Sequence, residues 1–265
     1  MALSRRSFIA ATSLGGLLQP LGTAGFTPSA ADLVPPTFRR HDPALAREMV
    51  GVSHGNATRV RELLSGRPAL AKASWDWGYG DWETALGAAS HVGNQEIAGL
   101  LIAAGAPVTL FSAAMLGQLD TVKAFIAASP GVQRVKGPHG ISLLAHARAG
   151  KATDVIAYLE SLGDAEPRYR DDALSEQDRA AILGTYSYGS GATERLVVSV
   201  NVRGRLVIRR GDASERILFH QGNRVFHPIG AEAVRIRFSG EPNSASLRIE
   251  DGPLLVVATR HYSRR

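Results

Sequence analysis

Three histidines recur at similar places along the chain, and residues of this type could hold one ion together. His54, His91 and His146 precede a recurring glycine by one, two and four residues. If the repeated units stack on one another, the imidazoles come close together, and imidazole is a common zinc ligand. The pattern therefore raises the question of a metal site.

Carboxylates and indoles are concentrated in a second stretch, WDWGYGDWE, which runs from Trp75 to Glu83 and holds all three tryptophans of the chain. Asp76, Asp81 and Glu83 are oxygen ligands of the kind that calcium prefers. The alternative is an acidic loop that is simply solvated, and we favour that interpretation. The glycines between the aromatic residues argue against a helix interior.

Familiar catalytic motifs are missing from the sequence. The chain has no cysteine, which excludes thiolate nucleophiles and thiolate metal sites. It has no His-Glu-x-x-His, no Ser-x-x-Lys and no Gly-x-Ser-x-Gly, and Gly189-Ser190-Gly191 resembles a turn between strands. Gly150-Lys151 lacks the other residues of a phosphate-binding loop. We expect no catalytic residues, and we expect that the protein is not an enzyme.

The N-terminal segment has the pattern of an export signal. Arg5 and Arg6 precede an uncharged, weakly apolar run that lasts until Asp32, and this run resembles the twin-arginine signal of bacteria. Ser29-Ala30-Ala31 offers the small residues that a signal peptidase recognises. We expect cleavage near Ala31, a periplasmic protein, and contact with the membrane only during export. The alternative is an uncleaved membrane anchor.

A repeated apolar pattern fills the middle of the chain. After each of Gly55, Gly93, Gly117 and Gly150, apolar residues follow at five, eight and nine positions. This spacing places all three on one face of a helix. Alanine-rich segments before the last three glycines predict a second helix that needs stacked neighbours to bury its surface.

The residues of the second unit resemble the ankyrin repeat. Thr84-Ala85-Leu86-Gly87-Ala88-Ala89 is similar to the Thr-Pro-Leu-His-x-Ala start, and Gly93 to Ala98 is similar to the turn into the second helix. Leu100 to Ala106 resembles the end of the repeat, and Gly140 to Ala145 is a looser copy of the start. The resemblance covers residues 46–165 and implies about four stacked repeats. It also implies that histidine near the glycine hydrogen-bonds the adjoining loop, so we expect neither a metal site nor a cofactor.

The repeat glycines are spaced by 38, 24 and 33 residues, and the longest step contains the tryptophan stretch. The resemblance implies that this stretch lies on a projecting connection, the part with which such arrays bind partners. Two interpretations remain for Trp75, Trp77 and Tyr79: exposed anchors for a partner, or aromatic side chains folded back onto the short third repeat. Trp82, close to the expected helix cap Thr84, is expected to pack. Together with His139 on another connection, these aromatic residues are the candidate partner-binding residues, and the expected function is non-enzymatic recognition of another protein.

The C-terminal third predicts β-structure. Ser175 can cap a short helix through Leu183, after which seven or eight runs of period-two pattern with hairpin-length gaps predict an antiparallel meander, closed or half-closed. Ile182 to Tyr186 and the following strands resemble the small β-domain appended to penicillin-recognising serine hydrolases, which implies no activity. We expect the interior to be filled with side chains. The alternative is a cup for a small apolar ligand, and with it a ligand-binding or accessory function.

Arginine is abundant in the same region. From Arg168 onward there are 16 arginines and 11 acidic residues. A basic region is compatible with nucleic-acid binding, but we expect these arginines on the solvent side of strands and no nucleic-acid partner.

The predicted organisation is α+β: an all-α ankyrin-repeat stack followed by an antiparallel, barrel-like β-domain. The predicted divisions are a signal peptide (1–31), a linker (32–45), ankyrin repeats (46–166), a connecting segment with a short helix (167–183) and the β-domain (184–262).

Overall fold

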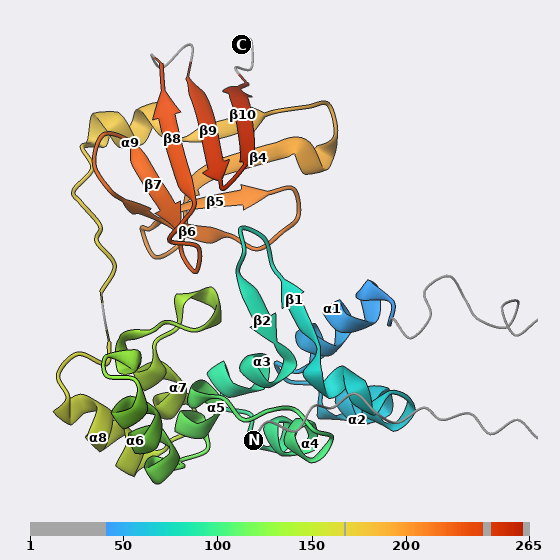
Figure 1. Ribbon diagram of the computed structural model, residues 1–265. Helices are drawn as coiled ribbons and strands as arrows, with labels where there is room; N and C mark the ends of the chain where they lie inside the picture. The colour runs from blue at the N-terminus through green and yellow to red at the C-terminus, as the bar shows by residue number, and fades with distance from the viewer. Residues whose placement is uncertain (1–40, 167, 241–244, 262–265) are drawn as a thin grey trace, which may run out of the picture. The chain divides into compact units, whose positions relative to one another are not determined.

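The computed structural model describes residues 41–166, 168–240 and 245–261. It combines helices with strands, and the C-terminal strands form a closed antiparallel barrel (Figure 1). The twin-arginine segment and the expected cleavage site lie outside the described residues. Within the described ranges, no helix has the length and apolar character needed to cross a membrane.

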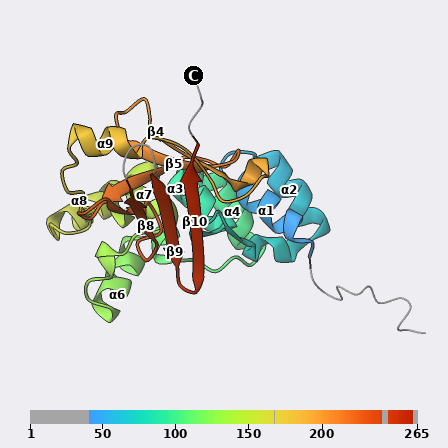
Figure 2. The same ribbon diagram turned by 90° about the horizontal axis from the view of Figure 1, so that it is seen from above.

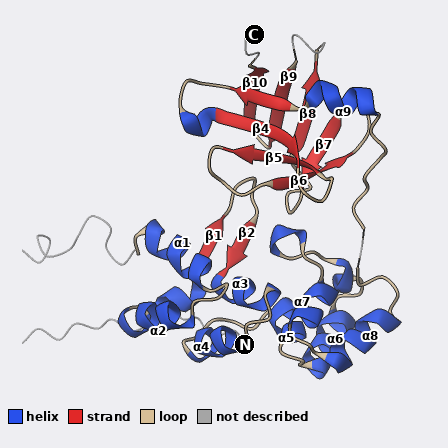
Figure 3. Ribbon diagram, turned by 180° about the vertical axis from the view of Figure 1, so that it is seen from behind, coloured by secondary structure: helices blue, strands red, loops and turns tan. Residues whose placement is uncertain are grey.

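The helical part consists of helices that follow one another in pairs (Figure 3). Side chains that accept a hydrogen bond from the first turn mark several starts, among them Asn56, Thr84, Asn94 and Ser142. The helices predicted from the glycine-based spacing are confirmed. The pairs are α1 Pro43–Val52 with α2 Ala57–Gly66, α3 Ala85–His91 with α4 Gln95–Ala103, α5 Leu110–Met115 with α6 Leu119–Ala128, and α7 Leu143–Ala149 with α8 Thr153–Ser161; short 3₁₀ turns are η2 Pro68–Lys72, η3 Val132–Arg134 and η4 Pro138–Gly140.

The first helices of the later pairs pack closely because their facing residues are small. Helix α5 contacts both α3 and α7, and α3 also contacts α7. Two of the repeat glycines lie where backbones meet. A Cβ on Gly93 would lie 2.1 Å from the carbonyl oxygen of Ala149, and a Cβ on Gly150 would lie 1.9 Å from that of Met115. These glycines are therefore required by the packing of one helix end against another.

Gly150→Ala should destabilise the protein by about 2–3 kcal/mol, because the new methyl group would overlap the backbone of Met115. Gly55→Ala is the matched control, since a Cβ at Gly55 would meet nothing within 4 Å. Urea unfolding of both variants measures the difference. Equal stability of the two variants would contradict this packing.

A short helix connects the two kinds of structure. Helix α9 spans Glu176–Ile182, and the Ser175 side chain caps it by accepting a hydrogen bond from the backbone N–H of Asp178. This confirms the short helix predicted from the sequence.

The barrel is built from eight strands, each hydrogen-bonded to its neighbours in the chain, and β10 closes it against β3. Figure 2 shows β8, β9 and β10 side by side. Inward side chains such as Leu196, Phe226 and Ile236 are buried and fill the interior, as expected for a barrel of this size. The strands are β3 Gly184–Ser187, β4 Arg195–Val200, β5 Leu206–Arg210, β6 Arg216–His220, β7 Val225–Pro228, β8 Arg235–Ser239, β9 Ser246–Asp251 and β10 Leu254–Arg260.

Most strand arginines lie on the solvent side, as expected from the alternation of side chains. Arg237 and Arg248 are about half exposed and both pair with Glu250. Arg216 is the exception, because its side chain is buried.

Candidate functional site

The tryptophan stretch forms a β-hairpin. Strands β1 (Ser74–Asp76) and β2 (Trp82–Thr84) pair antiparallel, with Trp75 opposite Glu83 and Asp76 opposite Trp82. The turn needs left-handed backbone conformations, which Gly78 and Gly80 supply with φ of 104° and 73°. Side chains of a strand alternate between faces, so Glu83 and Trp82 point to opposite sides.

The aromatic residues of the hairpin do not share one environment. Trp75 and Trp77 are half-buried against the core of the helical part, and Tyr79 is half-buried against the core of the barrel. Trp82 is 62% exposed. The expectation that Trp82 packs is wrong, because strand alternation turns its side chain outward when Glu83 turns inward.

Beneath the hairpin, four side chains from separate segments converge: His54 from the turn after α1, Glu83 from β2, His91 from the end of α3, and His139 from η4. We refer to these four as the histidine–glutamate cluster. One nitrogen or oxygen atom from each lies within 4.8 Å of the others.

The distances inside the cluster are short. His91 Nε2 lies 3.1 Å from His54 Nε2 and 3.0 Å from Glu83 Oε1. His139 Nε2 lies 3.4 Å from Glu83 Oε1, and His54 Nε2 lies 3.6 Å from Glu83 Oε2. Imidazole and carboxylate are both ligand types of transition metals.

Surrounding groups fix the orientation of the cluster. The indole Nε1–H of Trp77 donates to Glu83 Oε2 at 2.8 Å. His54 Nδ1 donates to the carbonyl oxygen of Gly51 at 3.0 Å. His139 Nδ1 lies 2.7 Å from Asp81 Oδ2, and the backbone N–H of His139 donates to Asp81 Oδ1 at 2.8 Å.

Asp81 extends this network to the barrel. Its carboxylate pairs with the buried Arg216 of β6, which also donates to the carbonyl oxygen of Trp77 at 3.1 Å. Asp81 and Glu83 are 2% and 0% exposed. The interpretation of a solvated acidic loop is therefore wrong for these two residues: histidine and arginine partners compensate their charges in the interior.

Burial and neighbouring charges act in opposite directions on the pKa values of the cluster. Burial alone would raise the pKa of Glu83, but the adjacent imidazoles of His139 and His91 outweigh it and lower the pKa to about 2. Burial alone would lower the pKa of His139, but its contacts with Asp81 and Glu83 raise that pKa to about 9. In the absence of other ligands, a protonated His139 thus lies between two ionised carboxylates.

The sequence pattern grouped His54, His91 and His146. The structure places His146 next to His91, with ring centroids 6.3 Å apart, but of these three only His54 and His91 belong to the cluster. His146 is fully buried, and its Nδ1 lies 2.8 Å from the Ser90 hydroxyl. Burial lowers its pKa to about 3, so the ring is neutral. His139, expected to contact a partner, instead belongs to the cluster and keeps 30% of its side chain exposed.

Sequence reasoning named Glu83 only as a possible calcium ligand and His139 only as a partner contact, and it grouped neither with His54 and His91. The alternation WDW…DWE contained a usable indication: if one of Trp82 and Glu83 faces solvent, the other faces the interior.

No protein-family model matches the chain, and a search of curated proteins finds no match.

In protein freed of metal with a chelator, raising the pH from 6.5 to 9 should lower the free energy of unfolding by about 2 kcal/mol through His139 alone. Because the pKa of His139 is raised on folding, its stabilising contribution is complete below its pKa in the unfolded chain, near 6.5. This contribution is lost as the pH rises through its pKa in the folded protein, about 9. Glu83, with its lowered pKa, adds stability that is lost only as the pH falls from 4.5 towards 2. Urea unfolding across this pH range, compared with His139→Gln, measures the effect. Parallel pH curves for the two proteins would contradict it.

Proposed function

We propose that this protein is a non-enzymatic recognition module, exported to the periplasm by the twin-arginine pathway and built on about four ankyrin repeats. The paired helices with small facing residues and the projecting hairpin support this proposal. The pattern of Arg5, Arg6 and Ser29–Ala31 supports export with cleavage near Ala31. The partner is another protein; nucleic acid is not a partner, and the membrane is met only in transit.

One observation carries the proposal: an ordered strand presents the indole of Trp82 with 62% of its surface exposed. Tryptophan is among the residues that most often dominate binding energy when a partner covers them. Its neighbour Glu83 is anchored below, so the indole is held on a fixed strand and little entropy is lost on binding.

A groove beside the hairpin adds a second contact area. It has a volume of about 500 Å³ and is lined by Trp75, Trp77 and Arg47, among others. The Arg47 guanidinium lies 5.9 Å from the centre of the Trp75 ring, a cation–π arrangement. His139 also lines this groove with its exposed edge, whereas Tyr79 lines a neighbouring pocket together with Trp77.

A photo-crosslinking amino acid at position 82 tests the proposal directly in the periplasm. We expect one dominant adduct from position 82 and none from position 202, since Val202 is a fully exposed residue of a barrel turn. Against the purified adduct partner, Trp82→Ala should weaken binding by about 2 kcal/mol. It should change unfolding stability by less than about 0.5 kcal/mol, because the side chain is exposed. Identical adducts from both positions, or unchanged affinity of Trp82→Ala, would refute the proposal.

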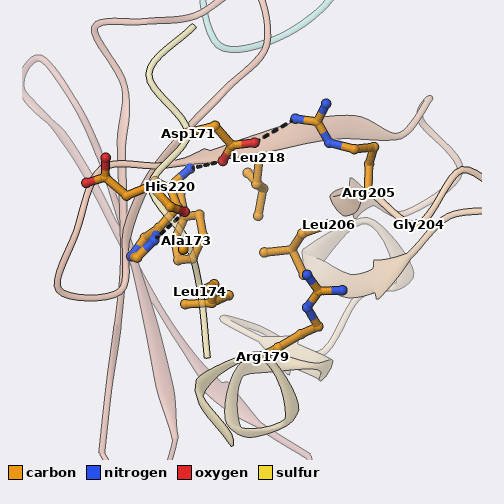
Figure 4. A pocket seen from close by; sticks show the side chains of 11 residues that line it. Asp171, Ala173, Leu174, Arg179, Gly204, Arg205, Leu206, Leu218 and His220 are labelled. Carbon is orange, nitrogen blue, oxygen red and sulfur yellow. Dashed lines mark hydrogen bonds and ion pairs between the residues drawn. The ribbon is translucent and has the colours of Figure 1, made fainter. Parts of the chain in front are cut away.

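A second candidate function is ligand binding by the barrel, which the cavity in Figure 4 favours. This cavity of about 400 Å³ is lined by the apolar side chains of Leu206, Leu218 and Phe226 on one part and by charged residues, among them Asp172 and Arg205, on another. Arg179 also lines it, and its Nε has no hydrogen-bond partner among the described residues; its ion pair with Glu176 is 4.0 Å long. Arg205, in contrast, is already paired with Asp171 at 3.0 Å. A small carboxylate with an apolar body fits this combination.

Hexanoate should therefore bind more tightly than hexan-1-ol, and Arg179→Gln should remove about tenfold of the hexanoate affinity. Arg195→Gln, an exposed arginine of β4, is the matched control. Isothermal titration calorimetry measures the affinity of the wild type for both ligands and the affinity of each variant for hexanoate. Equal affinity for the acid and the alcohol would exclude this ligand class.

A further inference from the structure

We propose that the histidine–glutamate cluster is a zinc site, in which Nε2 of His54, His91 and His139 and the Glu83 carboxylate bind one Zn²⁺. This goes beyond recognition of a partner, since neither Trp82 nor the groove requires an ion.

The separations inside the cluster match those between the ligands of a tetrahedral zinc ion. Zinc lies about 2.0–2.2 Å from nitrogen and oxygen ligands, which places two ligands of a tetrahedron about 3.3–3.6 Å apart. Three separations between these ligand atoms are 3.0, 3.1 and 3.4 Å, His54 Nε2 lies 3.6 Å from the other carboxylate oxygen of Glu83, and one ligand atom from each residue lies within 4.8 Å of the others. Small shifts of side chains would suffice for coordination.

The hydrogen bonds around the cluster hold Nδ1 of two histidines and direct their Nε2 atoms at its centre, where zinc would replace the Nε2 proton of His139. A carbonyl oxygen only accepts, so the proton of neutral His54 is on Nδ1, towards Gly51, and its Nε2 carries a lone pair. His139 Nδ1 is directed in the same way at the Asp81 carboxylate. A zinc-bound histidine characteristically donates its other N–H to a carbonyl or a carboxylate.

The hydrogen-bond geometry at the centre of the cluster is poor. Glu83 Oε1 is buried and accepts no well-formed hydrogen bond from the described residues, although imidazole nitrogens of His91 and His139 lie at 3.0 and 3.4 Å. If the Nε2–H of His91 donates to the His54 lone pair, that proton is not available for Glu83. Attraction to the neighbouring imidazoles offsets only part of the cost of burying this oxygen without a well-formed hydrogen bond. A cation at the centre would engage this oxygen and all three nitrogens.

The second carboxylate oxygen has its own partner. Because the Trp77 indole holds Oε2, Glu83 would bind the ion mainly through Oε1. The His54 and His139 side chains are 33% and 30% exposed and line the groove, which gives an ion a route from solvent.

The ligand set favours zinc over the hard cations. Three imidazoles and one carboxylate suit a transition metal, whereas calcium and magnesium prefer oxygen ligands throughout. Four protein ligands in a largely buried position are typical of a structural zinc site.

Such an ion would connect segments that are distant in the sequence. Its ligands come from the first helix pair, the hairpin, the second helix pair and the η4 segment before the fourth pair. The hairpin strands have only three residues each, and a short two-stranded hairpin is barely stable alone. Zinc would hold the hairpin in place.

The test uses the whole mature chain, without a polyhistidine tag, after removal of metals with a chelator. Titration with Co²⁺ should produce the intense visible absorption of a four-coordinate site at one equivalent, and Zn²⁺ should displace the cobalt. X-ray absorption of the zinc form should show three imidazoles and one oxygen ligand. Zn²⁺ should raise the Tm, whereas Ca²⁺ and Mg²⁺ should leave it unchanged.

Variants identify the ligands. His54→Ala and Glu83→Gln should each weaken Zn²⁺ binding by about 100-fold or more, whereas Glu96→Gln, at an exposed position of α4, should bind as the wild type does. Far-UV circular dichroism checks that each variant is folded; if Glu83→Gln is not, the absorption spectra of the wild type still decide. A six-coordinate cobalt spectrum, fewer than three imidazoles around zinc, or wild-type affinity in folded His54→Ala would overturn the assignment.

Discussion

The helical part of this protein depends on one buried charge, the carboxylate of Glu83. An ionised carboxylate with no exposed surface is very unfavourable unless polar partners surround it. Here those partners are the Trp77 indole and three imidazoles from separate segments. The turn after α1, the end of α3 and the η4 segment must therefore meet beneath the hairpin, and the exposed position of Trp82 follows from the burial of its neighbour.

Local patterns in the sequence were sufficient to predict the helices after the repeat glycines, the short α9 and the barrel strands, but not the β1–β2 hairpin. The apolar spacing after each repeat glycine predicted the second helix of each pair, since one face of a helix has a fixed period. Ser175 predicted the start of α9, and alternation with hairpin-length gaps predicted an antiparallel barrel-like meander. Each of these features depends on residues close together in the chain, which is why a single sequence contains them.

The cluster could not be predicted in the same way. Glu83 and His139 are far apart in the sequence, and neither lies in a motif that indicates their contact. Offsets from the repeat glycines suggested His146, but its Nδ1 lies against the Ser90 hydroxyl and its ring contacts only the edge of the cluster, at His91. The sequence also led to a wrong expectation for Trp82, because proximity to the helix cap at Thr84 was given more weight than strand alternation.

Nitrogen-15 NMR of the histidine rings tests the central claim, that three Nε2 atoms face one buried carboxylate. In metal-free protein at pH 7, His139 should be doubly protonated, and wherever the His54 ring is neutral its proton should be on Nδ1, facing the carbonyl oxygen of Gly51. On addition of Zn²⁺, the Nε2 resonances of His54, His91 and His139 should shift together. The ring nitrogen resonances of His146 should still report the same protonation state as before. Nε2–H forms of His54 and His139 that persist with Zn²⁺ present would contradict the claim.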